Sequence, residues 1–234
     1  MLGKPIYRLI IQTIAVLFLT YAITGGLLTT LPRLAGLGQT ARNLFYHVPM
    51  WFTMYLMMFI SVISSVLYLN KLNLKYDLWA RESAFVGIFF GLLGLTTGIV
   101  WSRVTWGELL PSTNPSAWWS WDPKQTNALI SILIYAAYFV LRGALEEDNQ
   151  RARIAGVYNI FAAASIVPLT FIIPRALGGL HPGAGGGGPV FNQADISNDY
   201  RMIFYPAIIG FMALAVWITD LRIRIRQLES ISEQ

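Results

Sequence analysis

Cysteine is absent from this chain of 234 residues, and histidine occurs only twice. The lack of cysteine excludes disulfide bonds, thiolate metal sites, cysteine nucleophiles and the C-x-x-C-H attachment signature. It does not indicate a redox compartment, because a cysteine-free chain is compatible with either side of a membrane. Any metal chemistry must therefore rest on the two histidines, on oxygen ligands or on methionine thioethers.

Charged residues are also few. They make up 12% of the chain, whereas hydrophobic residues make up 55%, and the mean hydropathy is +0.53. These values are far from those of a soluble domain and predict a membrane protein. The net charge of +5 does not indicate nucleic-acid binding, because the basic residues stand singly between apolar runs and no soluble basic domain is evident.

Six apolar runs are long enough, or nearly so, to cross a bilayer. They cover residues 9–31, 48–69, 84–101, 125–141, 154–173 and 202–218. The first run is too long for a signal-peptide core and no A-x-A site follows it, so we expect it to be retained. Without internal repeats or a separate soluble region, the sequence predicts an all-α protein: one domain over residues 1–234, a bundle of six transmembrane helices.

The basic residues predict how this bundle is oriented. Eleven of the seventeen lie at the termini and in the second and fourth connections, and six lie in the other three connections. Because cytoplasmic segments carry the excess of Lys and Arg, both termini are expected in the cytoplasm. In a Gram-negative bacterium the protein would lie in the inner membrane, with residues 32–47, 101–126 and 174–200 on the periplasmic side.

Residues 101–126, WSRVTWGELLPSTNPSAWWSWDPKQT, form a polar loop that contains five of the eight tryptophans. At its end, Asp122 suits a helix N-cap, Pro123 the first helical position and Gln125 the capping-box position, so a helix should begin at Asp122. Tryptophans also gather at membrane interfaces, which is the simpler interpretation of this loop. However, Trp118, Trp119 and Trp121 crowd against the start of one helix, where they would form a broad apolar shelf suited to a planar ligand with acidic groups.

The two histidines are predicted on the same side as this loop. His47 lies in YHVP, at or just ahead of the outer end of the second span, and His181 lies in LHPG, in the outer connection before the sixth span. Taken singly, each could be an interfacial or capping group. Two histidines without a third ligand are too few for a tetrahedral zinc site, but they suffice for the axial positions of a haem.

Other residues on the outer side have secondary roles in this hypothesis. Candidate donors to haem propionates are Arg33, Arg42, Arg103, Lys124, Arg175 and the free N–H groups ahead of Gln125. The methionines after His47 are interpreted as packing residues. The glycines at 87, 91, 94 and 98 form a stripe that should let two helices approach closely.

WWSWDPKQT, the Trp106–Gly107 pair and the histidines in YHVP and LHPG resemble the WWD-domain proteins of c-type cytochrome maturation. Over essentially the whole chain the resemblance is closest to the haem exporter protein C (CcmC) family. It implies haem b bound non-covalently at the outer face, with Trp106, Trp118, Trp119, Trp121 and Asp122 as WWD residues and His47 and His181 as axial ligands. It also implies delivery to a periplasmic haem chaperone, assisted by a small membrane partner subunit and ABC transporter subunits.

Two features depart from the CcmC pattern. The segment 108–117 is longer than usual between WG and WW, and Lys124 in WDPK is closer to the cytochrome c synthase component CcsA. CcsA-type proteins generally have further helices and a second histidine pair, so a CcsA-like role is kept as an alternative.

The sequence therefore predicts a haem-binding and haem-delivery protein rather than an enzyme. Two further alternatives remain: a secondary transporter, which should show intramembrane charges or broken helices, and a b-type electron-transfer cytochrome, which should hold its histidines inside the spans. An intramembrane hydrolase would need an activated nucleophile, and the predicted spans contain serines but no histidine or acid.

Overall fold

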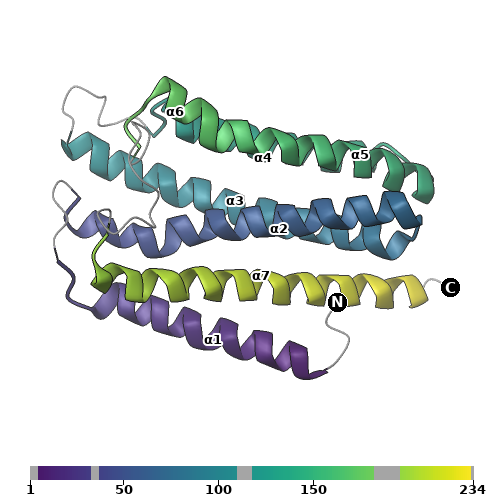
Figure 1. Ribbon diagram of the computed structural model, residues 1–234, viewed down its shortest axis with the longest axis horizontal. Helices are drawn as coiled ribbons and strands as arrows, with labels where there is room; N and C mark the ends of the chain where they lie inside the picture. Colours follow the sequence, from purple (N-terminus) through teal and green to yellow (C-terminus); the bar gives the residue numbers. More distant parts are fainter. Residues whose placement is uncertain (1–4, 33–36, 110–117, 182–195, 233–234) are drawn as a thin grey trace.

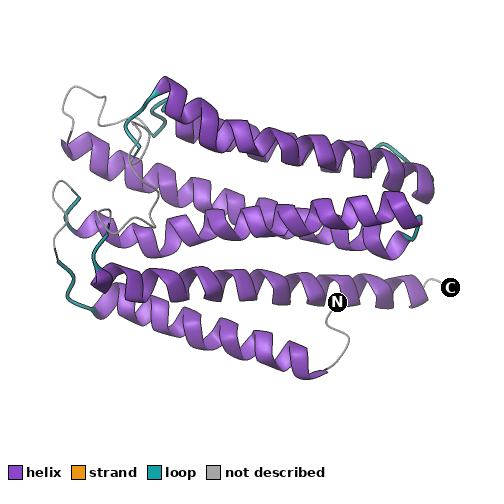
Figure 2. Ribbon diagram, viewed as in Figure 1, coloured by secondary structure: helices purple, strands orange, loops and turns teal. Residues whose placement is uncertain are grey.

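The computed structural model describes residues 5–32, 37–109, 118–181 and 196–232, and within them every regular element is helical (Figures 1 and 2). The elements are α1 (Pro5–Leu28), η1 (Gln39–Asn43), α2 (Leu44–Lys71), α3 (Leu74–Leu109), α4 (Pro123–Gly143), α5 (Asp148–Val167), η2 (Pro168–Ile172), α6 (Ile173–Leu177) and α7 (Asn198–Ser232). The long helices run side by side as one bundle, and α1 begins at the end of the bundle where α7 stops (Figure 1).

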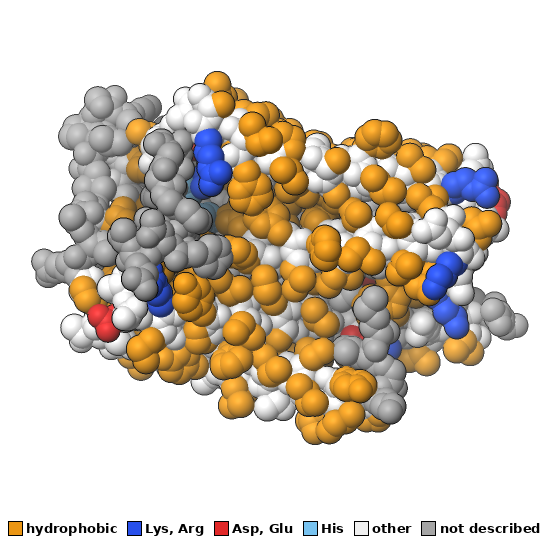
Figure 3. Space-filling view, in the orientation of Figure 1, with side chains coloured by type: hydrophobic (Ala, Val, Ile, Leu, Met, Phe, Trp, Pro, Cys, Tyr) orange, Lys and Arg blue, Asp and Glu red, His pale blue; other side chains and the backbone are white. Residues whose placement is uncertain are grey.

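Six helical stretches of the described chain are long and apolar enough to cross a membrane, which confirms the predicted number of spans. Figure 3 shows a wide hydrophobic band between two ends that carry most of the visible Lys and Arg side chains. The helices extend beyond the predicted apolar runs: α3 has 36 residues and α7 has 35. At 1.5 Å per residue each is about 50 Å long, whereas the hydrocarbon core is about 30 Å thick, so polar end turns continue these helices past it.

The stripe of glycines on α3 packs against α2, as the sequence predicted. A Cβ atom on Gly87, Gly91, Gly94 or Gly98 would come within 3.0 Å of a side chain, and the nearest atoms belong to Met58, Met54, Trp51 and His47 respectively. Met54, Met57 and Met58 are fully buried, so they are packing residues here. The absence of side chains on one helix thus makes room for the large side chains of the other.

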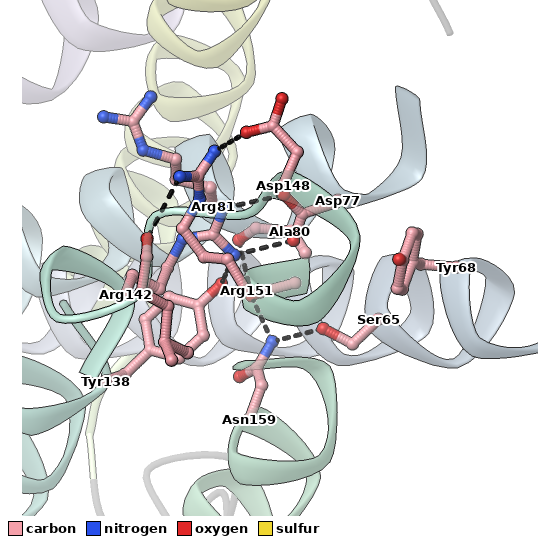
Figure 4. A network of polar contacts seen from close by, with 12 residues as sticks. Ser65, Tyr68, Asp77, Ala80, Arg81, Tyr138, Arg142, Asp148, Arg151 and Asn159 are labelled. Atoms are coloured by element: carbon pink, nitrogen blue, oxygen red, sulfur yellow. Dashed lines mark hydrogen bonds and ion pairs between the residues drawn. The ribbon is translucent and has the colours of Figure 1, made fainter. Parts of the chain in front are cut away.

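The end of the bundle at which α3 begins and α4 ends holds buried ion pairs that the sequence-based prediction missed (Figure 4). Asp77 on α3 accepts two hydrogen bonds of 2.6 Å from Arg142 on α4, and Arg142 also donates to the Tyr138 hydroxyl. Glu82, fully buried on α3, contacts Arg81 and, on α7, Arg222. The predicted span 84–101 contains no acid, but α3 begins earlier, at Leu74, so the turns carrying Asp77 and Glu82 belong to this helix and not to a loop.

The orientation of the bundle is a prediction that labelling can test, because the cysteine-free chain accepts single cysteines without interference. Ser197 and Ser230 are both exposed and lie at opposite ends of α7. In intact cells, a membrane-impermeant maleimide should label Ser197→Cys, and it should label Ser230→Cys only after permeabilisation. The opposite pattern would place both termini outside.

Candidate functional site

The start of α4 is fixed by the cap predicted from the sequence. Asp122 is the N-cap, and its Oδ1 accepts hydrogen bonds from the backbone N–H groups of Lys124 at 2.9 Å and Gln125 at 3.4 Å. Trp121, just before the cap, has a φ of 54°, an uncommon backbone conformation for a non-glycine residue that turns the chain sharply into the helix. The free N–H groups proposed as propionate donors are thus already bound to Asp122.

His47 lies on the first turn of α2, because this helix begins at Leu44 and not at the predicted residue 48. The imidazole Nδ1 is 2.9 Å from the Gly94 carbonyl oxygen and 3.2 Å from Thr97 Oγ1, both on α3. A carbonyl only accepts hydrogen bonds, so in the neutral ring Nδ1 carries the proton and Nε2 carries the lone pair. A backbone carbonyl that orients a histidine in this way is a common feature of metal-ligating imidazoles.

His181 follows a broken helix, in the predicted outer connection. Pro168 and Pro174 cannot donate backbone hydrogen bonds. The chain forms the π-helical turn η2 from Pro168 to Ile172, and α6 then ends at Leu177 with Gly178 as its C-cap. Tyr55 of α2 holds η2, since its hydroxyl donates to Thr170 and its ring packs on Phe171. The described connection then continues through Gly178–His181, which we call the strap, and Leu180 N–H donates to Asp122 Oδ2 at 2.8 Å.

The two histidines meet at one end of the bundle. Their ring centroids are 6.3 Å apart, with an angle of 38° between the rings, although 134 residues separate them along the chain. In the described part of the chain no cluster of three or more His, Cys, Asp or Glu residues could hold a metal ion. The geometry is therefore a two-imidazole site.

Two tryptophans pack against these histidines, Trp51 and Trp101, and neither is a predicted site residue. Trp51 packs edge-on to His47 at 6.2 Å, and the Trp101 ring is 6.1 Å from that of His181. Trp106 is buried behind Trp101, at 5.9 Å. The four-residue spacing of His47 and Trp51 places them on one helix face, a signal that could have identified Trp51.

Trp118, Trp119 and Trp121 lie ahead of α4 in different environments. Trp118 and Trp121 are exposed, at 58% and 77%, whereas Trp119 is half-buried and packs against the hydrophobic core. Trp119 and Trp121 meet at 80°, edge to face, so they do not form the flat shelf that the sequence suggested. Trp118 instead lies under the Arg103 guanidinium, whose Cζ is 4.2 Å from a ring centroid.

The basic residues at this end of the bundle differ in the groups that they contact. Arg42 donates to Gln39 and to the carbonyl oxygens of Gly26 and Thr29, so it closes the end of α1 and is not directed at the histidines. Arg103 is held over Trp118. Lys124 and Arg175 lie close enough to influence each other electrostatically, whereas Arg33 lies outside the described residues.

Comparison with known proteins relates the chain to one family. The sequence model of the family described as Heme exporter protein C matches residues 4–233. The chain is 30% identical to the Heme exporter protein C of Paracoccus denitrificans over 191 residues, which cover 80% of this chain and 73% of the relative. It is 26% identical to that of Rhodobacter capsulatus over 230 residues, covering 92% and 90%. The cytochrome c biogenesis protein CcsA of Prochlorococcus marinus subsp. pastoris matches a shorter stretch, with 36% identity over 108 residues, 46% of this chain and 30% of the relative.

Proposed function

Because the chain belongs to the haem exporter protein C family, we propose that it holds haem b non-covalently at the outer, periplasmic end of its bundle and passes it to a periplasmic haem chaperone. The family and the six apolar helices make it a multi-pass membrane protein that handles haem in cytochrome c biogenesis. The proposal adds a site, its ligands and an acceptor to that role.

The observation that carries the proposal is the distance between the two imidazoles. A metal–imidazole nitrogen bond is about 2 Å long, so two imidazoles on opposite sides of one iron have ring centres roughly 6 Å apart. The centroids of His47 and His181 are 6.3 Å apart. Haem iron accepts two axial nitrogen ligands, and His47 Nε2 and a ring nitrogen of His181 would fill these positions.

The residues around the histidines support a large apolar ligand with acidic edges. Trp51 and Trp101 contribute aromatic surface beside each imidazole. Exposed Trp118 and Trp121 contribute further surface at the same end. Arg103 on Trp118 and Lys124, which lies close enough to His47 to influence it electrostatically, are candidate donors to a propionate. Arg42 is a weaker candidate than the sequence suggested, because backbone carbonyls already occupy its guanidinium.

The same geometry supports release of the ligand. His47 is fixed on a spanning helix, whereas His181 is on the short strap after α6. A chain without cysteine has no thiol for covalent attachment, so the bound haem would stay exchangeable. We propose no catalytic residue: ATP hydrolysis would fall to ABC transporter subunits, and a small membrane partner subunit would complete the complex.

The experiment that tests this function measures haem content and transfer. The protein is purified in detergent, haem is quantified by the pyridine haemochrome assay, and the loaded protein is mixed with an apo haem chaperone of the same pathway. We expect b-type haem, up to one per chain, that moves to the chaperone. A protein that neither contains haem nor takes up added haemin would overturn the proposal and favour the transporter alternative.

A CcsA-like role is the second candidate, favoured by the matched CcsA stretch and by Lys124 in WDPK. A synthase component would promote covalent attachment of haem to an apocytochrome c peptide that carries C-x-x-C-H. Incubating the loaded protein with such a peptide distinguishes the two roles, because a delivery protein leaves the haem extractable by acidified acetone.

A further inference from the structure

Asp122 uses its two carboxylate oxygens for two different elements. Oδ1 accepts the N–H groups of Lys124 and Gln125 and caps α4, whereas Oδ2 accepts the N–H of Leu180 in the strap, at 2.8 Å. Asp122 as a whole is 5% exposed, so little water competes for these hydrogen bonds. A carboxylate has acceptor capacity for all three donors, and bonds to a charged acceptor are stronger than those between neutral groups.

The strap is shaped to reach this carboxylate. Gly178 has a φ of 72° and Gly179 a φ of 155°, conformations that favour glycine. A Cβ atom on Gly179 would lie 2.5 Å from Asp122 Oδ2 and 3.4 Å from Pro123 Cδ. The strap backbone therefore approaches Asp122 more closely than any other residue type would permit.

We propose that Asp122 is the positioning residue for His181: through its Oδ2, the N-cap of α4 holds the second imidazole opposite His47. Leu180, the residue bound by Asp122, is the direct chain neighbour of His181. The assignment of His181 as an axial ligand rests on the proposed function, but the hydrogen bond that places it does not. Since His47 is anchored separately by Gly94, Asp122 controls one ligand and leaves the other unchanged.

The variant that isolates this role is Asp122→Asn. An amide has one oxygen and one NH₂ group, so it can cap α4 through the oxygen, but it then presents N–H groups to the N–H of Leu180. The matched control is Glu147→Gln. Glu147 caps α5 through Asn149 and Gln150 at the opposite end of the bundle, and no bond from its carboxylate to another element is present among the described residues.

Hydrogen exchange in the haem-free protein tests the bond directly. We expect the amide of Leu180 to exchange roughly tenfold faster, or more, in Asp122→Asn than in the wild type, while the first turn of α4 stays protected. Glu147→Gln should leave Leu180 unchanged. Equal exchange of Leu180 in the wild type and Asp122→Asn would overturn the proposal, and this readout does not depend on haem binding.

The haem-loaded protein gives a second readout. Asp122→Asn should shift the visible spectrum from six-coordinate low-spin toward that of His181→Ala, and added imidazole should restore it, which a general loss of folding would not allow. An unshifted spectrum would overturn the proposal. If the wild type takes up no haem, the proposed function fails while hydrogen exchange still decides the role of Asp122.

A second variant, Gly179→Ala, tests the same hydrogen bond if Asp122→Asn does not fold. It keeps Asp122 and the cap of α4, but its methyl group would collide with Asp122 Oδ2 and so disrupt the bond to Leu180 from the side of the strap. It should reproduce the exchange and spectral changes of Asp122→Asn. Gly143→Ala is its control, because no atom lies within 4 Å of that Cβ position. Wild-type behaviour of Gly179→Ala would count against the proposal.

Discussion

Replacing either His47 or His181 with alanine is expected to lower the affinity for haem by roughly 100-fold or more, because loss of a ligand should cost at least as much as loss of a residue that orients one. The chain holds only these two histidines and no cysteine, so it cannot supply another imidazole or a thiolate. A haemin titration monitored by absorbance measures the affinity, and the pyridine haemochrome assay measures how much haem stays bound to the protein through purification. Wild-type binding by both variants would contradict the axial-ligand assignment.

Imidazole rescue separates a lost ligand from a lost fold in the same variants. The His47 side chain occupies a niche next to Gly94 and Gly98 on α3, so free imidazole can occupy the space that His47→Ala leaves. Added imidazole should restore a six-coordinate low-spin spectrum in His47→Ala and in His181→Ala. A control variant, Phe161→Leu, changes an exposed ring of α5 that makes no described contact with either histidine, and it should keep both ligands.

The parts of the fold that the sequence predicted correctly depend on strong local signals. Six spans follow from apolar runs, and the start of α4 follows from Asp122 as N-cap and Pro123 at the first helical position. The capping box predicted for Gln125 is not formed, because its Oε1 accepts a hydrogen bond from Ser120 Oγ instead. The glycine stripe on α3 predicted close packing because small residues at this spacing lie on one helix face. In each case the signal lies within one helix or at its end, and it depends on no contact with a distant part of the chain.

The features that the sequence did not predict depend on contacts between distant residues. Hydropathy places the ends of spans where charge begins, but α3 continues through Asp77 and Glu82 because arginines of α4 and α7 compensate their charge. Trp101 was recognised as part of the tryptophan-rich loop, but its contact with His181 depends on the break at η2 and α6. The bond from Asp122 to Leu180 spans 58 residues and has no local signature.

The second large effect is expected at the far end of the bundle, in Arg142→Met. Asp77 and Arg142 have side chains 12% and 7% exposed, and both carboxylate oxygens of Asp77 bind Arg142 (Figure 4). Removing the guanidinium leaves a buried carboxylate and the Tyr138 hydroxyl without this partner. The free energy of unfolding should fall by about 3–5 kcal/mol, measured by reversible unfolding in mixed detergent. The control is the pair of Asp148 and Arg151, whose side chains are 63% and 30% exposed, and Arg151→Gln should change stability by less than about 1 kcal/mol.

A double variant tests whether the loss in Arg142→Met comes from the unpaired charge. A buried ion pair can often be replaced by apolar residues at little cost, so Asp77→Leu combined with Arg142→Met should recover most of the stability that Arg142→Met loses. If Arg142→Met alone has wild-type stability, the pair contributes nothing to folding. If the double variant is less stable than the single one, the pair is favourable beyond charge compensation.

The pair joins α3 to α4 at the end of the bundle opposite the histidines. Folded molecules of either variant should therefore keep the wild-type haem spectrum, which separates the effect of the ion pair on stability from haem ligation.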